Sequence, residues 1–145
     1  MSGVSGEQLL RLPIRVRGID VGNAVDLILD PEHRRVLGFD VLCRDDEHRF
    51  LPLTVAGIGA DEITVPSALT MLEEGELAFY RSRASTMRLL RGADVRIRRH
   101  SLGSFEDVVV DGGGAISGIV VSNAGVRTTV DAAATTIVRR DASAA

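Results

Sequence analysis

Short runs of alternating apolar and polar residues dominate this chain, and glycine, proline or aspartate separates them. The clearest run ends at a polar break over residues 30–34 and resumes at Val36. One face of it carries Val25, Leu27 and Leu29, and the opposite face carries Asp26, Ile28 and Asp30. A period of two, with aliphatic and β-branched residues on both sides of the break, predicts a strand, a turn and a second strand.

The same pattern occurs a second time. Gly22, Asp26 and Asp30 match Gly103, Asp107 and Asp111 at an offset of 81 residues. In copy two the face equivalent to Val25, Leu27 and Leu29 carries Glu106, Val108 and Val110. The opposite face carries Asp107, Val109 and Asp111. Residues 38–41 then match 118–121 at an offset of 80, and the lead-in 9–11 matches 89–91 at that same offset. An internal repeat of this length predicts one structural module present twice.

Each copy offers about five short strands, since β-rich runs also occur outside the repeated hairpin. They fall at 13–17, 50–53 and 63–65 in copy one, and at 93–98, 126–130 and 135–138 in copy two. Closing such strands into a ring removes exposed sheet edges. The sequence therefore predicts a mainly β fold of two tandem small antiparallel β-barrels joined by a short helical segment.

These patterns predict a first domain over residues 9–66, a helical connector over 67–88, a second domain over 89–140 and a frayed tail over 141–145. The connector begins after Pro66 with a short helix that Gly75 ends, and a second helical turn over 85–91 ends at Gly92. Its leucines and methionines predict packing against the barrels, so the two modules are not expected to tumble independently.

The repeated motif resembles the PRC-barrel family. Copy one carries the residues of the resemblance as Gly22, Asp26, Leu27, Leu29, Asp30, Val36, Gly38 and Phe39, followed by residues 50–53. Copy two keeps Gly92, Gly103, Asp107, Val108, Val110, Asp111, Ile116 and Gly118 but has no counterpart of Pro52. The resemblance implies a six-stranded barrel that acts as a docking or assembly element in the photosynthetic reaction centre H subunit and in the ribosome maturation factor. It implies no catalytic residue and no cofactor. The mid-strand positions of Gly38 and Gly118 predict a bulge, a bend or a close backbone approach.

Composition narrows the classes of function. The 145 residues include one cysteine, no tryptophan and no lysine, and the net charge is −3. A lysine Schiff base and an intrachain disulfide are excluded, and recognition by aromatic stacking is disfavoured. No apolar run approaches the ~20 residues of a membrane span. With no leader-like stretch before Leu9, we expect a cytoplasmic protein.

Candidate chemistry is sparse. Cys43, Asp45 and His48 lie close in sequence but lack an orienting partner, and His33 and His100 are too scattered for metal binding. We expect Asp30 and Asp111 to accept turn amides, and Asp26 and Asp107 to keep an outer face soluble. The members of each pair are ~13 Å apart along a strand, too far to share one ion. No metal, no cofactor and no catalytic residue is predicted.

The local charge asymmetry is a run of arginines, which we take as the candidate partner-binding residues: Arg81, Arg83, Arg88, Arg91, Arg96, Arg98 and Arg99. A solvated face paired with Glu73, Glu74 and Glu76 is the plainer interpretation. The leading hypothesis is a non-enzymatic scaffold or adaptor that binds a protein partner. The alternatives are an RNA-binding or ribosome-assembly factor that uses Arg81 to Arg99, and a cytosolic regulatory module of a membrane transporter complex. Peripheral membrane association and a homo-oligomer stay open.

Overall fold

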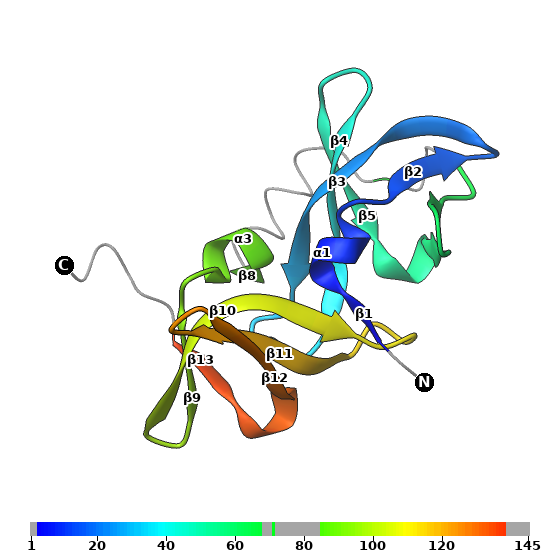
Figure 1. Cartoon of the computed structure of the whole chain (residues 1–145). Helices are drawn as coiled ribbons and strands as arrows, with labels where there is room; N and C mark the ends of the chain where they lie inside the picture. The colour runs from blue at the N-terminus through cyan, green and yellow to red at the C-terminus, as the bar shows by residue number, and fades with distance from the viewer. Residues whose placement is uncertain (1–2, 68–70, 72–84, 139–145) are drawn as a thin grey trace.

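The computed structural model describes residues 3–67, 71 and 85–138 and has a mainly β fold of two curled, open sheets (Figure 1). The first sheet contains β2 (Pro13–Val16), β3 (Ile19–Leu29), β4 (Val36–Cys43), β5 (His48–Pro52), β6 (Gly57–Ile58), β7 (Ile63–Thr64) and β8 (Ser85–Thr86). The second contains β1 (Val4–Ser5), β9 (Asp94–Ile97), β10 (His100–Val110), β11 (Ile116–Asn123), β12 (Val126–Asp131) and β13 (Thr136–Val138). The short helices are α1 (Gly6–Leu9), α3 (Met87–Leu90) and the 3-10 turns η1 (Leu53–Val55) and η3 (Ala132–Ala134).

The two sheets repeat one order of elements, as the sequence predicted. Strands β2 to β5 and η1 correspond to β9 to β12 and η3. The first hairpin of each copy closes through a two-residue loop at the same place, because Val16 pairs with Ile19 and Ile97 pairs with His100. Arg17 and Arg98 both have positive φ there, as the mirror-image hairpin turns require. The repeat is therefore structural as well as sequential.

A bulge interrupts the long strand of each copy at an equivalent residue. The register of β3 against β4 shifts at Val25, and that of β10 against β11 shifts at Glu106. A bulge changes which face the following side chains occupy. The predicted single alternation is therefore wrong beyond this point, and Asp26, which the pattern placed outside, is buried together with residues 27–29.

The mid-strand glycines accommodate a close neighbour on the adjacent strand, as predicted. A Cβ at Gly38 would collide with the carbonyl oxygen of Leu51 and would lie 2.7 Å from the Phe50 ring. At Gly118 it would lie 2.9 Å from the Thr129 side chain. The absence of a side chain thus lets β5 and β12 pack closely on β4 and β11.

Neither sheet closes through its end strands in the described part of the chain. The first runs from β5 to β6 and the second from β12 to β13, with no ladder between the ends. The copies also differ here: β7 runs parallel to β2, whereas β13 runs antiparallel to β9. The β6–β7 hairpin of copy one reverses the chain before it reaches β2. The two closed barrels stay a prediction.

The segments that precede the two copies are exchanged between the sheets. Strand β1 lies before copy one but pairs with β10 of copy two, and β8 lies before copy two but pairs with β3 of copy one. Each continues into a four-residue helix, so α1 and α3 flank the junction (Figure 1). The exchange joins the two sheets reciprocally.

The exchange corrects the predicted alignment of the lead-ins by one residue. Ser5 and Thr86 are both helix N-caps, and Leu9 and Leu90 are both buried at the helix ends, an offset of 81. Leu89, which the sequence matched to Leu9, is exposed. The predicted turn over 85–91 is helical only at Met87–Leu90, and its predicted stop, Gly92, has positive φ. The predicted helix after Pro66 falls almost wholly outside the described residues.

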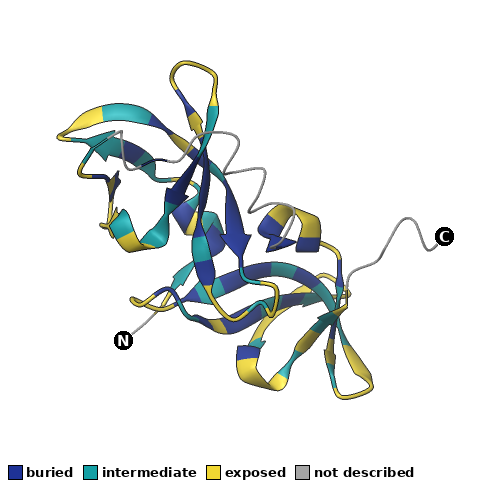
Figure 2. Cartoon of the chain, turned by 180° about the vertical axis from the view of Figure 1, so that it is seen from behind, coloured by how far each residue is buried: buried dark blue, intermediate teal, exposed yellow. Residues whose placement is uncertain are grey.

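One hydrophobic cluster spans both copies, and buried residues run along β3, β4 and β10 (Figure 2). The turns at its edge also pair across the junction: the Val36 amide donates to the Gly114 carbonyl at 2.9 Å, and the Ile116 amide donates to the Arg34 carbonyl at 2.8 Å. The two sheets therefore form one packed unit. No helix of the described residues is long and apolar enough to cross a membrane.

Candidate binding site at the junction of the two sheets

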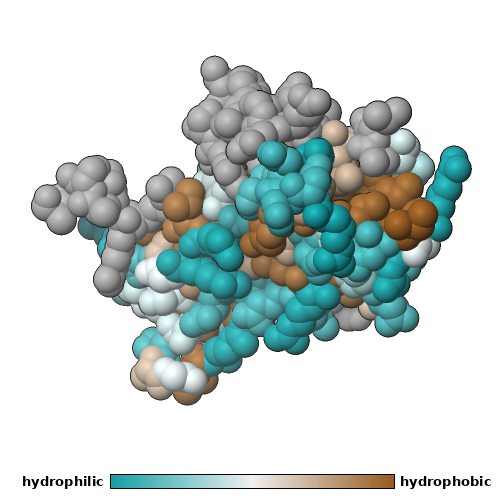
Figure 3. All heavy atoms as spheres, turned by 90° about the horizontal axis from the view of Figure 1, so that it is seen from above, coloured by the Kyte–Doolittle hydropathy of each residue, from teal (hydrophilic) through white to brown (hydrophobic). Residues whose placement is uncertain are grey.

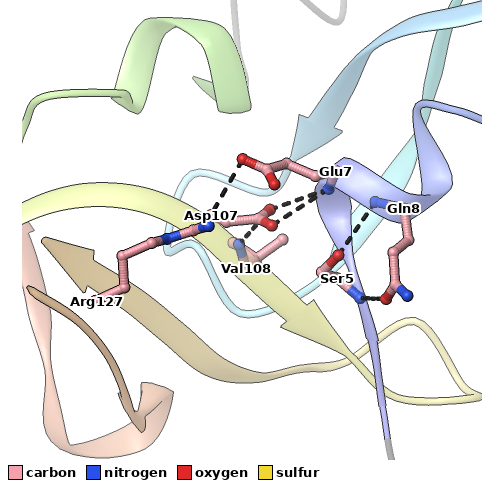
Figure 4. A network of polar contacts seen from close by, with 6 residues as sticks. All are labelled: Ser5, Glu7, Gln8, Asp107, Val108 and Arg127. Carbon is pink, nitrogen blue, oxygen red and sulfur yellow. Dashed lines mark hydrogen bonds and ion pairs between the residues drawn. The ribbon is translucent and has the colours of Figure 1, made fainter.

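A buried carboxylate holds each exchanged helix in place. Asp107 on β10 accepts hydrogen bonds from the Glu7 amide of α1 through both carboxylate oxygens, at 3.2 and 3.3 Å. It also accepts one from the amide of its neighbour Val108, at 2.8 Å (Figure 4). Ser5 and Gln8 complete the start of the helix as a reciprocal capping box. The first turn of α1 is thus satisfied partly by its own residues and partly by the opposite copy.

Asp26 has the same role in the other direction. Its Oδ1 accepts the Arg88 amide of α3 at 3.1 Å and the Leu27 amide at 2.9 Å. Thr86 caps the same helix by accepting the Leu89 amide at 3.2 Å. The two aspartates therefore form a reciprocal pair of clasps between the copies.

These clasps overturn the prediction that Asp26 and Asp107 keep an outer face soluble. Their exposed fractions are 7% and 1%, and desolvation by that burial raises the pKa of each carboxyl above the ordinary 3.8. The amide hydrogen bonds act in the opposite direction and lower the pKa in part. Both aspartates are structural elements of the junction.

The other two aspartates follow the prediction. Asp30 accepts the amides of Arg34 and Arg35 at 2.6 and 3.1 Å. Asp111 accepts those of Gly113 and Ala115 at 2.9 and 3.0 Å. Both therefore fix the turn between the two long strands of their copy.

A groove of about 570 Å³ lies beside the second of these turns. Both copies and the exchanged β1 contribute its apolar lining, which includes Val4, Leu9, Leu37, Leu53, Ile58 and Val110. The glycine-rich turn 112–114 forms a rim, and the Arg35 guanidinium donates to the Gly113 carbonyl at 2.7 Å. Ile58 is 42% exposed at this groove. The arrangement can bind an apolar side chain or short apolar segment next to a fixed cationic group.

The equivalent position of the other copy has a different surface. A hollow of about 330 Å³ lies between the turn 31–34 and η3. Its polar lining is Glu32, His33, Arg34 and two threonines, and Ile119, Ala132 and Ile137 also line it. His33 Nε2 lies 3.0 Å from the Ser85 hydroxyl. The two copies share one frame, but of these two equivalent hollows the groove beside Gly114 is the more apolar.

The predicted arginine site divides between two elements. Arg88 and Arg91 lie on and directly after α3, whereas Arg98 and Arg99 form the hairpin tip at the far end of β9. Four strand residues, ~13 Å, separate the two groups. Arg96 is exposed between them and is paired with Asp94. Arg81 and Arg83 lie outside the described residues.

The residues near Cys43 do not assemble as a thiol site. Cys43 is buried, Asp45 pairs with Arg49 at 2.7 Å, and this exposed ion pair lowers the pKa of Asp45 to about 2. His48 instead places Nδ1 2.8 Å from Asp40, a carboxylate only 2% exposed. Asp40 was not among the residues predicted to matter, although an aspartate between the apolar residues of β4 is itself a signal.

A scan against models of protein families and a search of curated proteins each found no match to this chain.

Proposed function

We propose that this chain is a non-enzymatic adaptor, built from two PRC-barrel-like modules, that binds a protein partner at the apolar groove beside Gly114. The resemblance of the repeated motif supports the module, together with the common order of elements and the matched glycines Gly38 and Gly118. The exchanged lead-ins give the two modules a fixed relative position, which suits a docking element.

The groove itself carries the proposal. It draws apolar side chains from both copies and from β1, and its polar counterpart in the other half indicates that the two copies serve different purposes. Apolar patches break the hydrophilic surface of the face in Figure 3. Pockets of this size with an apolar lining bind inserted aliphatic or aromatic anchors of a partner.

Changing Ile58 to glutamate is expected to abolish capture of the partner without unfolding the chain. The side chain is 42% exposed, so a charge there costs little in the free protein but must be desolvated when an apolar anchor docks. The amount of partner captured is measured by crosslinking from a photoreactive residue at position 54 and identification of the crosslinked protein.

Ile19→Glu is the matched control, since Ile19 is 68% exposed and lies outside the groove. It should leave capture unchanged. If both variants lost capture of the partner equally, or if neither variant lost it, the assignment of the groove would be contradicted.

The alternative of RNA binding rests on Arg98 and Arg99, which are both exposed at a hairpin tip where their side chains can reach phosphates. If RNA binding holds, the double variant Arg98→Glu with Arg99→Glu should weaken binding of a structured RNA. The slope of log affinity against log salt should also become shallower, by the amount that corresponds to the loss of about two phosphate contacts. A filter-binding titration at several salt concentrations checks this. Arg17→Glu, at the equivalent tip of copy one, is the control, and an unchanged slope rejects the alternative.

A further inference from the structure

Strand β12 has an exposed outer edge. It ends the second sheet, and no strand of the described residues pairs with its outer side. Its residues are exposed except Val130, which is half-buried. An exposed edge strand of six residues is a template for another strand.

The hairpin before β12 decides which backbone groups point outward. Asn123 pairs with Val126 across the two-residue loop Ala124-Gly125, and both loop residues have positive φ. Such a loop is closed by a hydrogen-bonded pair, after which inward and outward residues alternate along the strand. The N–H and C=O groups of Arg127, Thr129 and Asp131 therefore point away from β11.

The equivalent edge in copy one is protected. Strand β5 carries Pro52 at the position of Asp131, since Pro52 pairs with Gly38 as Asp131 pairs with Gly118. Proline removes an outward donor, and the neighbouring Phe50 and Leu51 are buried. Strand β12 contains no proline and no bulge against β11. The difference between the copies leaves β12 open to pairing.

We propose that β12 pairs antiparallel with β12 of a second copy of this chain, about a two-fold axis at Thr129. This register places Arg127 opposite Asp131 of the second copy, and Asp131 opposite its Arg127, so that both outward pairs are oppositely charged. Thr129 faces its own counterpart. Opposite charges and threonine pairs are favourable across antiparallel strands, and the order Arg-Thr-Thr-Val-Asp is thereby complementary to itself.

The faces of the strand fit this register. Val126, Thr128 and Val130 line a shallow hollow of about 490 Å³ with Leu102 and Val121, and pairing places Val130 opposite Thr128 of the second copy on this same face. On the other face Arg127 has only a loose contact with Glu7, at 3.7 Å, and the Asp131 carboxylate accepts the Ala133 amide at 3.0 Å. Both charges can meet an additional partner from the second copy.

Sedimentation velocity on the full chain tests the proposal. The wild type should dimerise, and Arg127→Asp or Asp131→Arg should each weaken the dimer at least about tenfold, since each creates two like-charged pairs. The double charge exchange, Arg127→Asp with Asp131→Arg, should restore it to within about threefold. Arg98→Asp makes the same charge change at the hairpin tip and should have no effect.

Backbone variants distinguish a dimer that forms by strand pairing from one that forms by attraction between charges alone. Thr129→Pro removes an outward amide and should give a monomer with an unchanged circular dichroism spectrum; if that variant fails to fold, Thr129→Lys places like charges on the axis instead. A wild type that stays monomeric at its highest soluble concentration overturns the proposal, as does failure of the double exchange to restore the dimer. A monomer that binds an unrelated extended peptide along β12 overturns it as well.

Discussion

Replacing Met87 with alanine is expected to lower the free energy of unfolding by about 2–5 kcal/mol. Met87 opens α3, is fully buried, and lies where the two exchanged helices meet: a Cβ at Gly6 of α1 would be only 2.7 Å from its sulfur. Truncation removes the side chain that fills this contact and leaves a cavity in the cluster shared by both copies. Urea denaturation measures the change.

The same helix supplies the control. Leu89 is 56% exposed, so Leu89→Ala should change the stability by no more than about 0.5 kcal/mol. Equal effects of Met87→Ala and Leu89→Ala would mean that α3 is not packed at the junction as the structure has it.

A double-mutant cycle with Gly6→Ala tests the contact itself. The added methyl should destabilise the wild type, because its Cβ would approach both the Met87 sulfur and, at 2.6 Å, the Asp107 carboxylate. Removing the sulfur relieves only the first conflict. The two changes should therefore couple by about 1 kcal/mol, and strict additivity would contradict the close approach of the two helices.

The features that the sequence predicted are those with local causes. The hairpins of each copy and the turn aspartates Asp30 and Asp111 depend on residues within a few positions of each other. The helix stop at Gly92, which has positive φ, and the close approaches at Gly38 and Gly118 also follow from the chemistry of single residues. Such local features form in the same way whatever contacts the distant parts of the chain make.

The junction could not be predicted from the sequence because its contacts join residues that are far apart in the chain. The Glu7 amide meets Asp107 across 100 residues, and a four-residue helix such as α1 carries no periodicity to reveal it. One bulge at Val25 was enough to move Asp26 from the predicted outer face into the interior. The apolar groove likewise combines residues from three separate segments.

Whether the arginines of the run share one surface could not be predicted from the sequence. They are close together in the chain, but β9 separates Arg91 from Arg98 and Arg99, and Asp94 partly neutralises Arg96. Local charge density along a chain becomes a surface patch only if the strand between the charges turns back, and β9 turns only at its far end.

Replacing Asp107 with alanine is expected to lower the free energy of unfolding by about 1–3 kcal/mol at neutral pH, since it leaves the amides of Glu7 and Val108 without their acceptor. Asp107→Asn keeps an acceptor oxygen and removes the buried charge, so it should lose less. Loss of α1 packing in the alanine variant can be followed by hydrogen exchange at Glu7.

The pH dependence separates a buried carboxylate from an ordinary cap. Burial raises the pKa of Asp26 and Asp107 in the folded chain above 3.8, and unfolding returns it towards that value. Between pH 3.8 and the raised pKa, the folded state therefore binds more protons than the unfolded state. The free energy of unfolding falls as the pH rises through this interval. Asp107→Asn should remove its share of this decline.

Asp45 provides an internal reference with the opposite sign. Its ion pair with Arg49 lowers the pKa to about 2, so whatever it contributes is lost as the pH falls from 3.8 towards 2. Asp45→Asn should therefore change the slope of stability against pH only on the acid side of 3.8, and Asp107→Asn should change that slope only above 3.8. If both variants changed the slope in the same interval, Asp107 would not be the buried clasp that holds the first helix to the second sheet.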